Sequence, residues 1–270
     1  MNIKNIFSLE NKTAIVTGAT GLLGKQHCYA LYEAGANVVI TDLDSQYCNL
    51  LALELGNKAI GIPCDITSIE DLNNLLELSL SKFGRIDILV NNAAINDMVE
   101  NPVTLLEDSK FENYPLEIFR KVIDVNITGI FLTCQVIGSN MYQNKYGSII
   151  NIASTYGIVA PNQSLYQDSE GNQLFYKSPA YPISKGAVIS FTKYLAAYWG
   201  NIGIRVNCLS PGGVRNKQNE YFIQKYSEMT PLKRMANPDD YKGALVFLAS
   251  DASSYMTGAN LVVDGGWTIW

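Results

Sequence analysis

Short apolar segments alternate along the chain with longer segments of helical periodicity. The clearest apolar segments are TAIVTG from Thr13, NVVITD from Asn37 and DILVNNAA from Asp87. Similar runs follow in GSIINIAS, IRVNCLS and NLVVDGG, and helical patterns such as KQHCYALYEAG and IEDLNNLLELSLSKFG lie among them. Apolar runs joined by helices are typical of buried parallel strands with crossover helices. The pattern therefore predicts an α/β fold, a doubly wound parallel sheet with helices on both faces.

The composition is that of one globular domain. Of the 270 residues, 47% are apolar and 17% are charged, which is enough apolar material to bury a core. The sequence has no internal repeat, low-complexity linker or shift in composition. We therefore expect residues 1–270 to form a single domain.

The charge balance favours a small-molecule partner. The formal net charge is -5, and no cluster of Lys and Arg counteracts it, so we expect neither nucleic acid nor an anionic membrane as a partner. The start of the sequence, MNIKNIFSLENK, lacks the features of a secretory signal, and no later segment has the uninterrupted apolar length of a membrane span. We expect a cytoplasmic protein.

Cysteine and histidine give no sign of a metal site. The five cysteines form no Cys-x-x-Cys pair and no close set with the single histidine, His27. We expect no metal ion and no disulfide framework. His27 lies on a predicted helix, as a packed or solvated side chain.

The segment TGATGLLG is a candidate phosphate-binding loop. It follows the first predicted strand and opens the first predicted helix, with glycines at 18, 21 and 24. Free backbone N–H groups and a positive helix end favour a pyrophosphate there, and glycine leaves room for its approach. We expect Gly21 to form the turn and Leu22 to pack beneath it. The predicted cofactor contacts of this loop are Gly18, Thr20, Gly21, Leu22, Leu23 and Gly24.

An acidic residue ends the second predicted strand. Asp42 lies 24 positions after Gly18 and is followed by Leu43. A carboxylate there can accept hydrogen bonds from both ribose hydroxyls and would repel a 2'-phosphate, so NAD is predicted over NADP, with Leu43 beside it. The alternative is that Asp42 caps the next helix.

A phenol and an ammonium are spaced four residues apart in AYPISKGA. Tyr181 and Lys185 would share one face of a helix. Such pairs occur by chance in many helices, so by itself this pair favours a structural contact over a catalytic site. Pro182 is tolerable only in the first helical turn, so the helix is expected to begin just before Tyr181, with Ser178 as a candidate cap.

The order of motifs resembles the classical short-chain dehydrogenase/reductase family, from about residue 11 to residue 266. The motifs are the glycine loop, the acidic strand end, CDIT, NNAA, DVNITG, a strand-end serine, Tyr-x-x-x-Lys, SPGGV and LVVDGG. The resemblance implies a Rossmann-type fold and an NAD(P)-dependent enzyme that acts on CH–OH groups. It implies a catalytic tetrad of Asn126, Ser154, Tyr181 and Lys185. It also implies that Asp65 and Ile66 hold adenine, that Asn92 and Ala93 border the ribose, that Pro211, Gly212 and Val214 line the nicotinamide, and that Tyr181 and Lys185 contact the cofactor.

The chemistry of this tetrad can be stated from the side chains. A hydride leaves a carbinol carbon only if the hydroxyl proton also leaves, so a base is needed at that oxygen. Tyrosine has a reference pKa of about 10, and the Lys185 ammonium and an oxidised nicotinamide would both favour its phenolate. Ser154 can stabilise charge on the reacting oxygen, and Asn126 can fix a water that relays protons. Ser154, Asn126 and Lys185 also have purely structural alternatives.

The glycine loop departs from the classical branch, which usually has glycine where this chain has Leu22. Its spacing is similar to that of the extended branch, which includes sugar-nucleotide epimerases and dehydratases. A recycled-NAD epimerase or dehydratase is therefore an alternative function, although 270 residues leave little room for the substrate domain of that branch. A non-enzymatic NAD-responsive binding protein is a third alternative.

Two enlarged segments follow predicted strand ends and are expected to shape the substrate pocket. They lie near residues 96–115 and 160–179, and the second separates Ser154 from Tyr181 by 27 positions. The second offers aromatic rings beside amides and carboxylates, which suits a sugar, although its aromatics could instead fold onto the body of the protein. These residues are Tyr166, Phe175, Tyr176, Asn162, Gln163, Gln167, Asp168 and Asn172.

Further features concern the lid, the substrate class and assembly. A polar, aromatic segment near 212–236 is a candidate lid, on which Arg215, Lys217, Lys233 or Arg234 could meet an anionic group. STYGIVAP and VDGGWTIW are similar to a bacterial subset associated with flagellin-glycan or surface-carbohydrate biosynthesis. The predicted helices in 122–142 and 185–200 are too apolar for full exposure, so a homo-oligomer, by resemblance a homotetramer, is expected.

Overall fold

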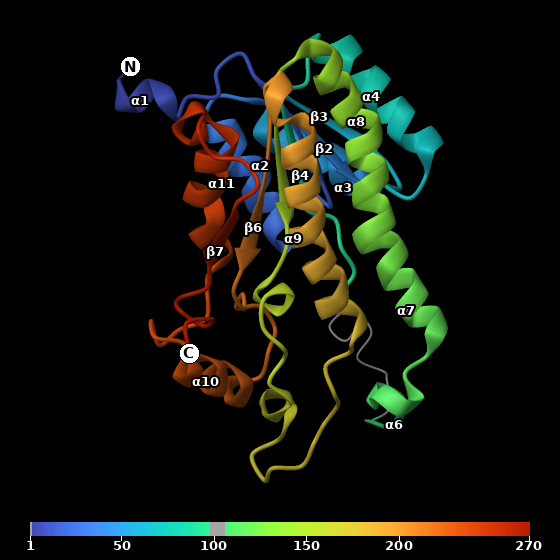
Figure 1. Cartoon of the computed structure of the whole chain (residues 1–270), viewed down its shortest axis with the longest axis vertical. Helices are drawn as coiled ribbons and strands as arrows, with labels where there is room; N and C mark the ends of the chain where they lie inside the picture. Colours follow the sequence, from blue (N-terminus) through green and yellow to red (C-terminus); the bar gives the residue numbers. More distant parts are fainter. Residues whose placement is uncertain (1, 98–105) are drawn as a thin grey trace.

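The computed structural model describes residues 2–97 and 106–270. Its centre is one seven-stranded sheet in the order β3-β2-β1-β4-β5-β6-β7, with every neighbouring pair parallel (Figure 1). This confirms the predicted doubly wound fold. The strands are β1 Thr13–Thr17, β2 Asn37–Asp42, β3 Ala59–Pro63, β4 Ile88–Asn91, β5 Gly147–Ile152, β6 Ile204–Pro211 and β7 Asn260–Val263.

Helices cover both faces of the sheet. The principal α-helices are α2 Leu22–Glu33, α3 Ser45–Leu55, α4 Ile69–Phe83, α7 Leu116–Ile123, α8 Ile130–Asn144, α9 Ala180–Trp199, α10 Glu220–Met229 and α11 Lys242–Ala249. The short helices α1 Ile3–Ile6 and α6 Leu106–Ser109 lie at the N-terminus and near one end of the molecule. The sheet therefore lies between two helical layers and is shielded on both sides.

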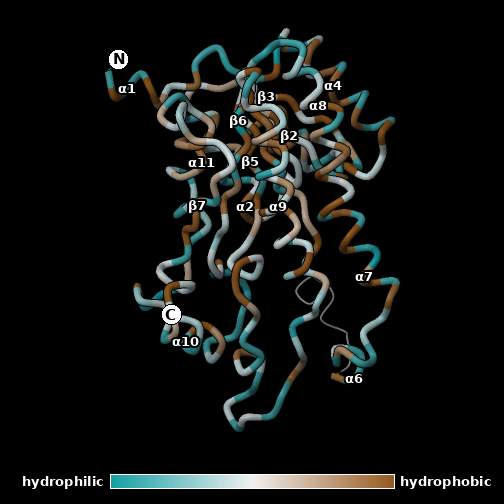
Figure 2. Tube along the Cα trace, in the orientation of Figure 1, coloured by the Kyte–Doolittle hydropathy of each residue, from teal (hydrophilic) through white to brown (hydrophobic). Residues whose placement is uncertain are grey.

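Alternation along each strand divides the core into two parts. Ala14 and Val16 belong to the apolar cluster that includes residues of α2, α3 and α11, whereas Ile15 belongs to the cluster that includes residues of α4, α8 and α9. Since successive side chains of a strand point to opposite faces, a strand buried on both faces carries apolar residues at successive positions rather than at alternate ones. The brown hydrophobic stretches at the sheet in Figure 2 follow from this pattern.

The edge strand β3 has no counterpart in the predicted pattern. Its sequence, AIGIP, contains Gly61 and Pro63, which are usually depleted in strands. Gly61 is required because an added Cβ would lie 2.5 Å from the backbone carbon of Cys48 in α3. Pro63 is tolerated because β3 is an edge strand with a neighbour on one side only.

The longest helical segment, Leu116–Asn144, joins α7 and α8 through a π-helical turn, η2 Asp124–Gly129. Among the described residues it is the one helix long and apolar enough to cross a membrane, with a mean hydropathy of 1.5. Its residues Ile130, Ile137 and Met141 pack into the apolar cluster between the sheet and α4 and α9. These contacts are those of the core helix of a doubly wound fold.

A third apolar cluster lies at the end of the molecule where α10 and the segment 160–179 project from the sheet (Figure 1). Tyr166 contributes from the short helix η4 Gln163–Tyr166, Tyr226 from α10, and Trp267 from the C-terminal segment. The rings of Tyr226 and Trp267 are stacked with centroids 4.2 Å apart. This cluster fastens the enlarged segment 160–179 to α10 and to the C-terminal segment.

His27 is packed rather than solvated. It is fully buried on α2, and neither ring nitrogen has a hydrogen-bond partner. Burial lowers its pKa to about 4. A buried polar group without a hydrogen-bond partner destabilises the fold, so we expect His27 to lower the free energy of unfolding.

A His27→Leu variant is expected to raise the free energy of unfolding by about 1–2 kcal/mol at pH 7, because it removes unpaired ring nitrogens. In the wild type, the unfolded chain binds one more proton than the fold between about pH 6.5 and 4, so stability falls as the pH decreases through that window. Between pH 6.5 and pH 4, the free energy of unfolding of the variant should fall by about 3 kcal/mol less than that of the wild type, as measured by urea unfolding. An equal loss in both proteins would contradict this account.

Candidate active site

The glycine loop between β1 and α2 is compact because its glycines touch backbone. Gly18 has a φ of +59°, and an added Cβ would lie 2.7 Å from the Cα of Ala93. At Gly24 an added Cβ would lie 2.1 Å from the carbonyl oxygen of Gly18. The Asn92 amide donates to the carbonyls of Thr17 and Gly18 at 3.0 and 2.8 Å. The NNAA segment thus fastens the loop, a role that the sequence did not reveal.

The loop leaves the start of α2 open. Gly21 is the N-cap residue of α2, with no side-chain hydrogen bond to the helix. The prediction that Leu22 packs beneath the turn is wrong: Leu22 is the first residue of α2 and is 43% exposed. Its side chain points outward because the space below is filled by the contact between Gly24 and Gly18. The N-terminal amides of a 12-residue helix can therefore meet an anion.

Asp42 ends β2 beside this loop. Its Oδ2 accepts hydrogen bonds from the backbone N–H and the hydroxyl of Thr20 at 3.0 and 2.6 Å, and its Oδ1 accepts from the N–H of Leu43 at 2.8 Å. The alternative role as a helix cap is wrong, because Asp44 caps α3. A carboxylate oxygen has two lone pairs, so the two bonds from Thr20 occupy Oδ2, whereas Oδ1, with one bond from Leu43, retains acceptor capacity for a ribose hydroxyl.

Other predicted cofactor residues also follow strand ends. Asp65 follows β3 and accepts hydrogen bonds from the N–H and hydroxyl of Thr67 at 2.9 and 2.7 Å. Ile66 is buried against η2, where an added Cβ on Gly129 would lie 2.6 Å from the Ile66 Cδ1. Their contacts with adenine remain a prediction.

The predicted nicotinamide segment follows β6. Pro211 is the last residue of β6, and Gly212 is pressed against Asp264, whose Cα would lie 2.8 Å from an added Cβ. Val214 forms an isolated parallel bridge with Ala236. The segment is thus held at the carboxyl edge of the sheet, where open parallel sheets bind ligands.

Tyr181 and Lys185 lie on the first turns of α9. The Lys185 Nζ is 5.6 Å from the centroid of the Tyr181 ring and donates to the carbonyl oxygen of Ile152 at 2.7 Å. Lys185 is 2% exposed, and this burial lowers its pKa to about 8. The predicted neighbourhood of phenol and ammonium is therefore present, with the ammonium buried and the phenol partly exposed.

Ser154 follows β5 and is brought to α9 by a close backbone contact. Its Oγ accepts from the N–H of Tyr156 at 3.2 Å and caps the short helix η3 Thr155–Gly157. At Gly157 an added Cβ would lie 2.7 Å from the backbone of Lys185. The glycine allows the turn that carries Ser154 to rest directly on the helix that carries Tyr181 and Lys185.

Asn126 lies in the π-helical turn η2 and is fully buried. Its amide donates to the carbonyl of Ile95 and to the hydroxyl of Ser184, both at 3.0 Å, and its Oδ1 accepts from the N–H of Ile95 at 2.7 Å. Ser184 in turn donates to the carbonyl of Tyr181 at 2.8 Å. These bonds give Asn126 a structural role, and a π-turn is common at functional sites. Its role in a proton relay remains a prediction.

The start of α9 agrees in part with its prediction. Pro182 lies in the first turn, as expected, but the cap position is Pro179 rather than Ser178. Ser178 instead donates to the Oδ1 of Asp97 at 2.8 Å, and Tyr114 donates to the Oδ2 at 2.7 Å. Buried Asp97, which the sequence analysis missed, thus joins the two enlarged segments. Residues 98–105 of the predicted segment 96–115 lie outside the described residues.

The second enlarged segment differs from its prediction as an open sugar-binding surface. Tyr166 and Phe175 pack against each other, with ring centroids 5.0 Å apart, in the third apolar cluster. Asp168 accepts from the N–H groups of Glu170 and Asn172, both at 2.9 Å. These side chains stabilise the segment itself, so the alternative that its aromatics fold onto the body is confirmed for Tyr166 and Phe175.

Three cations proposed for the lid are engaged within it. Arg234 contacts Asp240 at 2.5 Å, Arg215 contacts Glu220 at 3.5 Å, and the Lys233 Nζ donates to the carbonyl of Glu228 at 2.7 Å. These pairs favour a structural role for the three side chains over recognition of a substrate anion.

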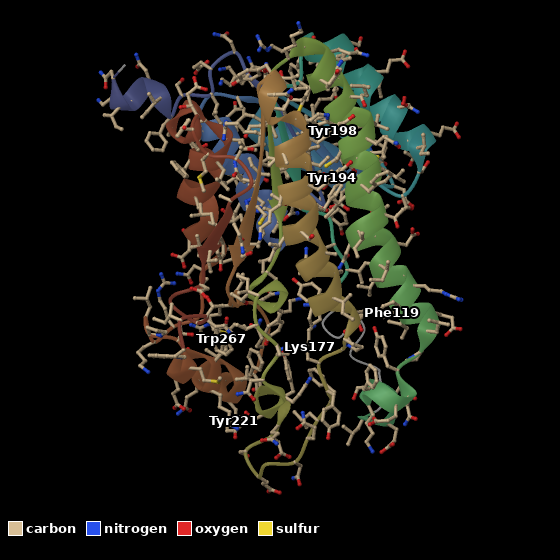
Figure 3. The ribbon with its side chains drawn as sticks, viewed as in Figure 1. Phe119, Lys177, Tyr194, Tyr198, Tyr221 and Trp267 are labelled. Atoms are coloured by element: carbon tan, nitrogen blue, oxygen red, sulfur yellow. The ribbon has the colours of Figure 1, made fainter. Side chains whose placement is uncertain are left out.

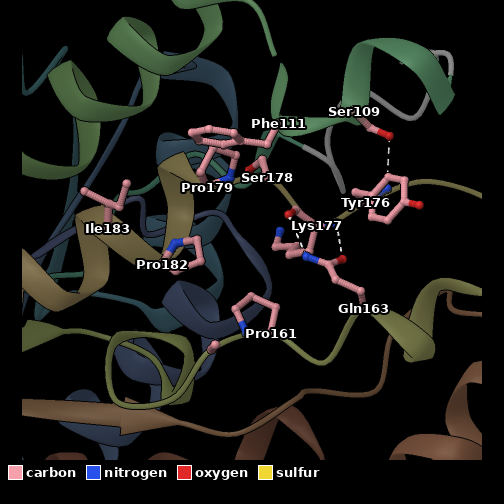
Figure 4. Close-up of a pocket in the computed structure, with 11 residues that line it drawn as sticks. Ser109, Phe111, Pro161, Gln163, Tyr176, Lys177, Ser178, Pro179, Pro182 and Ile183 are labelled. Atoms are coloured by element: carbon pink, nitrogen blue, oxygen red, sulfur yellow. Dashed lines mark hydrogen bonds between the residues drawn. The ribbon is translucent and has the colours of Figure 1, made fainter. Parts of the chain in front are cut away.

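A cavity of about 340 Å³ lies between the enlarged segments and the start of α9 (Figure 4). Its lining is largely apolar and includes Phe111, Pro161, Pro182 and Ile183. Neither Ser154 nor Tyr181 lines it, so it lies beside the predicted catalytic groups rather than over them.

Lys177 is the site residue that sequence reasoning missed (Figure 3). It is 6% exposed, and its Nζ lies 4.8 Å from the centroid of the Tyr181 ring, closer than the Nζ of Lys185. The only signal was a lysine four positions before Tyr181, and Lys177 precedes the helix, so helical spacing could not indicate the contact.

Cysteine and metal chemistry find no support in the described part of the chain. All five cysteines are buried free thiols, and burial raises the pKa of Cys48 and of Cys208 to about 11. Within residues 2–97 and 106–270, no three His, Cys, Asp or Glu side chains are grouped so that they could hold a metal ion.

Comparisons with known proteins agree along the whole chain. D-threitol dehydrogenase of Mycolicibacterium smegmatis is 33% identical over 97% of this chain and 95% of its own length. Galactitol 2-dehydrogenase (L-tagatose-forming) of Cereibacter sphaeroides is 32% identical over 100% of both chains. The post-translational flagellin modification protein A of Campylobacter coli is 31% identical over 96% of this chain and 99% of its own.

Solved structures show the same architecture. A short-chain type dehydrogenase/reductase from Mycobacterium marinum superposes with a TM-score of 0.85 at 33% identity, over 99% of each chain. A gluconate 5-dehydrogenase from Burkholderia cenocepacia, solved with NADP and tartrate, gives 0.87 at 28% identity over 100% of each chain. The family model described as enoyl-(acyl carrier protein) reductase matches residues 18–268. With the glycine loop, the strand-end serine and the Tyr-Lys pair in place, the chain belongs to the short-chain dehydrogenase/reductase family.

Proposed function

We propose that this protein is an NAD-dependent oxidoreductase that interconverts a secondary alcohol and a ketone on a sugar-like substrate, with Tyr181 as the acid/base. The observation that carries the proposal is the buried Lys185 ammonium 5.6 Å from the Tyr181 ring, on the helix against which the Ser154 turn packs. Such a site provides a base, a cation that favours the phenolate and a hydroxyl for the reacting oxygen.

The roles of the side chains follow from these positions. In the oxidative direction the Tyr181 phenolate accepts the proton of the substrate hydroxyl, and Ser154 donates a hydrogen bond to the oxygen on which charge develops. Lys185 stabilises the phenolate electrostatically. Asn126 donates hydrogen bonds to Ile95 and to Ser184, and it thereby joins the segment after β4 to α9.

The chain fits a dinucleotide cofactor. Gly18 and Gly24 lie where side chains would collide with the loop backbone, and the open N-terminus of α2 favours a pyrophosphate. When bound, the nicotinamide supplies a hydride acceptor. The Asp42 carboxylate beside Thr20 favours NAD, since a 2'-phosphate would be repelled, although one structural relative holds NADP.

The substrate class is supported by the relatives. Three of them are named for threitol, galactitol or gluconate, all polyhydroxylated compounds. The relative named for flagellin modification agrees with the predicted similarity to glycan biosynthesis. A polyol or a related sugar derivative is therefore the proposed substrate class. We also propose that the protein acts in the cytoplasm.

A homo-oligomer, with a tetramer favoured, is also proposed. Tyr194 and Tyr198 of α9 are each 62% exposed and stack in parallel with centroids 6.0 Å apart, beside Phe191, and Phe131 of α8 is 46% exposed (Figure 3). A contiguous exposed aromatic surface is typical of a protein–protein interface.

The test titrates NADH and NADPH separately by fluorescence and then offers the NAD-bound protein a panel of sugar alcohols, aldonates and phosphosugars while nicotinamide absorbance is followed. We expect tighter NADH binding and reduction of NAD by one polyol class. Product formation without net NADH would favour a recycled-cofactor epimerase or dehydratase. Binding without any turnover would favour a sensor, and a preference for NADPH would contradict the role assigned to Asp42.

A further inference from the structure

A second lysine lies at the ring of the proposed catalytic tyrosine. The Lys177 Nζ is 4.8 Å from the centroid of the Tyr181 ring, and the Lys185 Nζ is 5.6 Å from it. The two lysines come from different segments, because Lys177 precedes α9 whereas Lys185 is inside it. Both side chains are buried, at 6% and 2% exposure, so neither charge is strongly screened by water.

The position of Lys177 is fixed by the segment that carries it. The Lys177 N–H donates to the Oε1 of Gln163 at 2.8 Å, and the Nε2 of Gln163 donates to the Lys177 carbonyl at 3.2 Å (Figure 4). The next residue, Ser178, is tied to buried Asp97 at 2.8 Å. At the other end of the side chain, the Nζ donates to the Oδ1 of Asn96. A flexible side chain is thus held at both ends.

We propose that Lys177 is a second cation of the acid/base site, which acts through Tyr181 by favouring its phenolate form. The inference rests on the proposed function, because it assigns Lys177 to the proton transfer at that phenol. A phenolate shares its negative charge with its ring, so a cation 4.8 Å from the centroid of that ring stabilises the anionic form, and the low dielectric of a buried site strengthens the effect. Lys177 therefore acts on Tyr181 through its charge. It is a positioning residue, because it does not touch the reacting atoms.

The other ionisable groups around Tyr181 do not replace this cation. Lys185 loses its charge as the pH rises through about 8, because burial lowers its pKa. Tyr166 of η4 interacts electrostatically with Tyr181, and its hydroxyl is hydrogen-bonded to that of Tyr156 in η3 at 2.9 Å. Burial raises the pKa of both tyrosines, so they stay neutral. The carboxylate of Asp97 is occupied by neutral hydroxyl donors.

The first test measures kcat/KM for polyol oxidation against pH in Lys177→Met and Lys177→Arg. We expect the acid limb of the Met variant to move up by about one pH unit, with about a tenfold lower rate at pH 7 and recovery toward the wild-type rate at higher pH. The Arg variant keeps the charge, so its acid limb should lie at the same pH as that of the wild type. Lys82→Met removes an exposed charge from the end of α4 and should change neither the acid limb nor the rate at pH 7.

A second readout needs no substrate. The phenolate absorbance of Tyr181 is titrated as the difference between each protein and the same protein carrying Tyr181→Phe. A midpoint that rises by about one pH unit in Lys177→Met supports the proposal even if no polyol is turned over. An unchanged midpoint overturns it and leaves the proposed function intact. A rate loss that is equal at every pH, or confined to carboxylate-bearing substrates, also overturns it, and the latter would make Lys177 an anchor for a substrate anion.

Discussion

A Tyr181→Phe variant is expected to lose about 10³-fold in kcat/KM for the polyol substrate, because it removes the hydroxyl of the phenol beside Lys185 without changing the ring. The ring packing and the contact with Lys177 remain possible, so the fold should persist. Fluorescence titration should show NADH affinity within a few-fold of wild type, since one hydrogen bond to the cofactor contributes about 1 kcal/mol.

The control for this variant is Tyr255→Phe. Tyr255 is fully exposed, outside both the site and the proposed interface, so the loss of its hydroxyl should leave turnover unchanged. Turnover by Tyr181→Phe at the wild-type rate would remove Tyr181 from the acid/base role. A simultaneous loss of NADH binding and of thermal stability would instead indicate a structural role.

A Gly24→Ala variant is expected to weaken NADH binding by more than about 100-fold and to destabilise the fold by about 3 kcal/mol. The added methyl would lie 2.1 Å from the carbonyl oxygen of Gly18 and 2.8 Å from the Cα of Ala19. Both atoms belong to backbone, so relief requires the loop to move away from the start of α2, where the pyrophosphate would bind. NADH titration and urea unfolding measure the two effects.

Two other glycines make this prediction falsifiable. Gly243→Ala on α11 introduces a methyl with no atom within 4 Å, so it should raise stability by about 0.5–1 kcal/mol and leave binding unchanged. Gly21→Ala meets only the Gly18 carbonyl at 3.3 Å, so it should fold and show a smaller loss of affinity even if Gly24→Ala does not fold. Wild-type NADH affinity in Gly24→Ala would contradict the assignment of the loop.

The pattern of apolar residues was sufficient to predict the strands whose burial follows from their own sequence. Six of the seven strands were predicted from short apolar runs, which occur because the central strands of a doubly wound sheet are covered on both faces. The edge strand β3 was missed because Gly61 and Pro63 are chosen by the contact with α3 and by the edge position, neither of which is visible in a one-dimensional pattern.

The site shows the same division. Tyr181 and Lys185 are neighbours through helical geometry alone, so their spacing was sufficient to predict the pair. Leu22 was wrongly expected to be packed, because its exposure depends on how closely Gly24 approaches Gly18. Tyr166 and Phe175 were candidates for sugar contacts, but the presence of Tyr226 and Trp267 beside them makes them core.

The sequence by itself determined six of the seven strands, the glycine loop, the acidic end of β2 and the pairing of Tyr181 with Lys185, because each depends on residues close together in the chain. The tertiary structure alone decided that Asp42 braces Thr20, that Asp97 joins the two enlarged segments and that Lys177 reaches the ring of Tyr181. These contacts depend on long loops whose paths are set by packing and buried hydrogen bonds, and the periodicity of the chain carries no record of those paths.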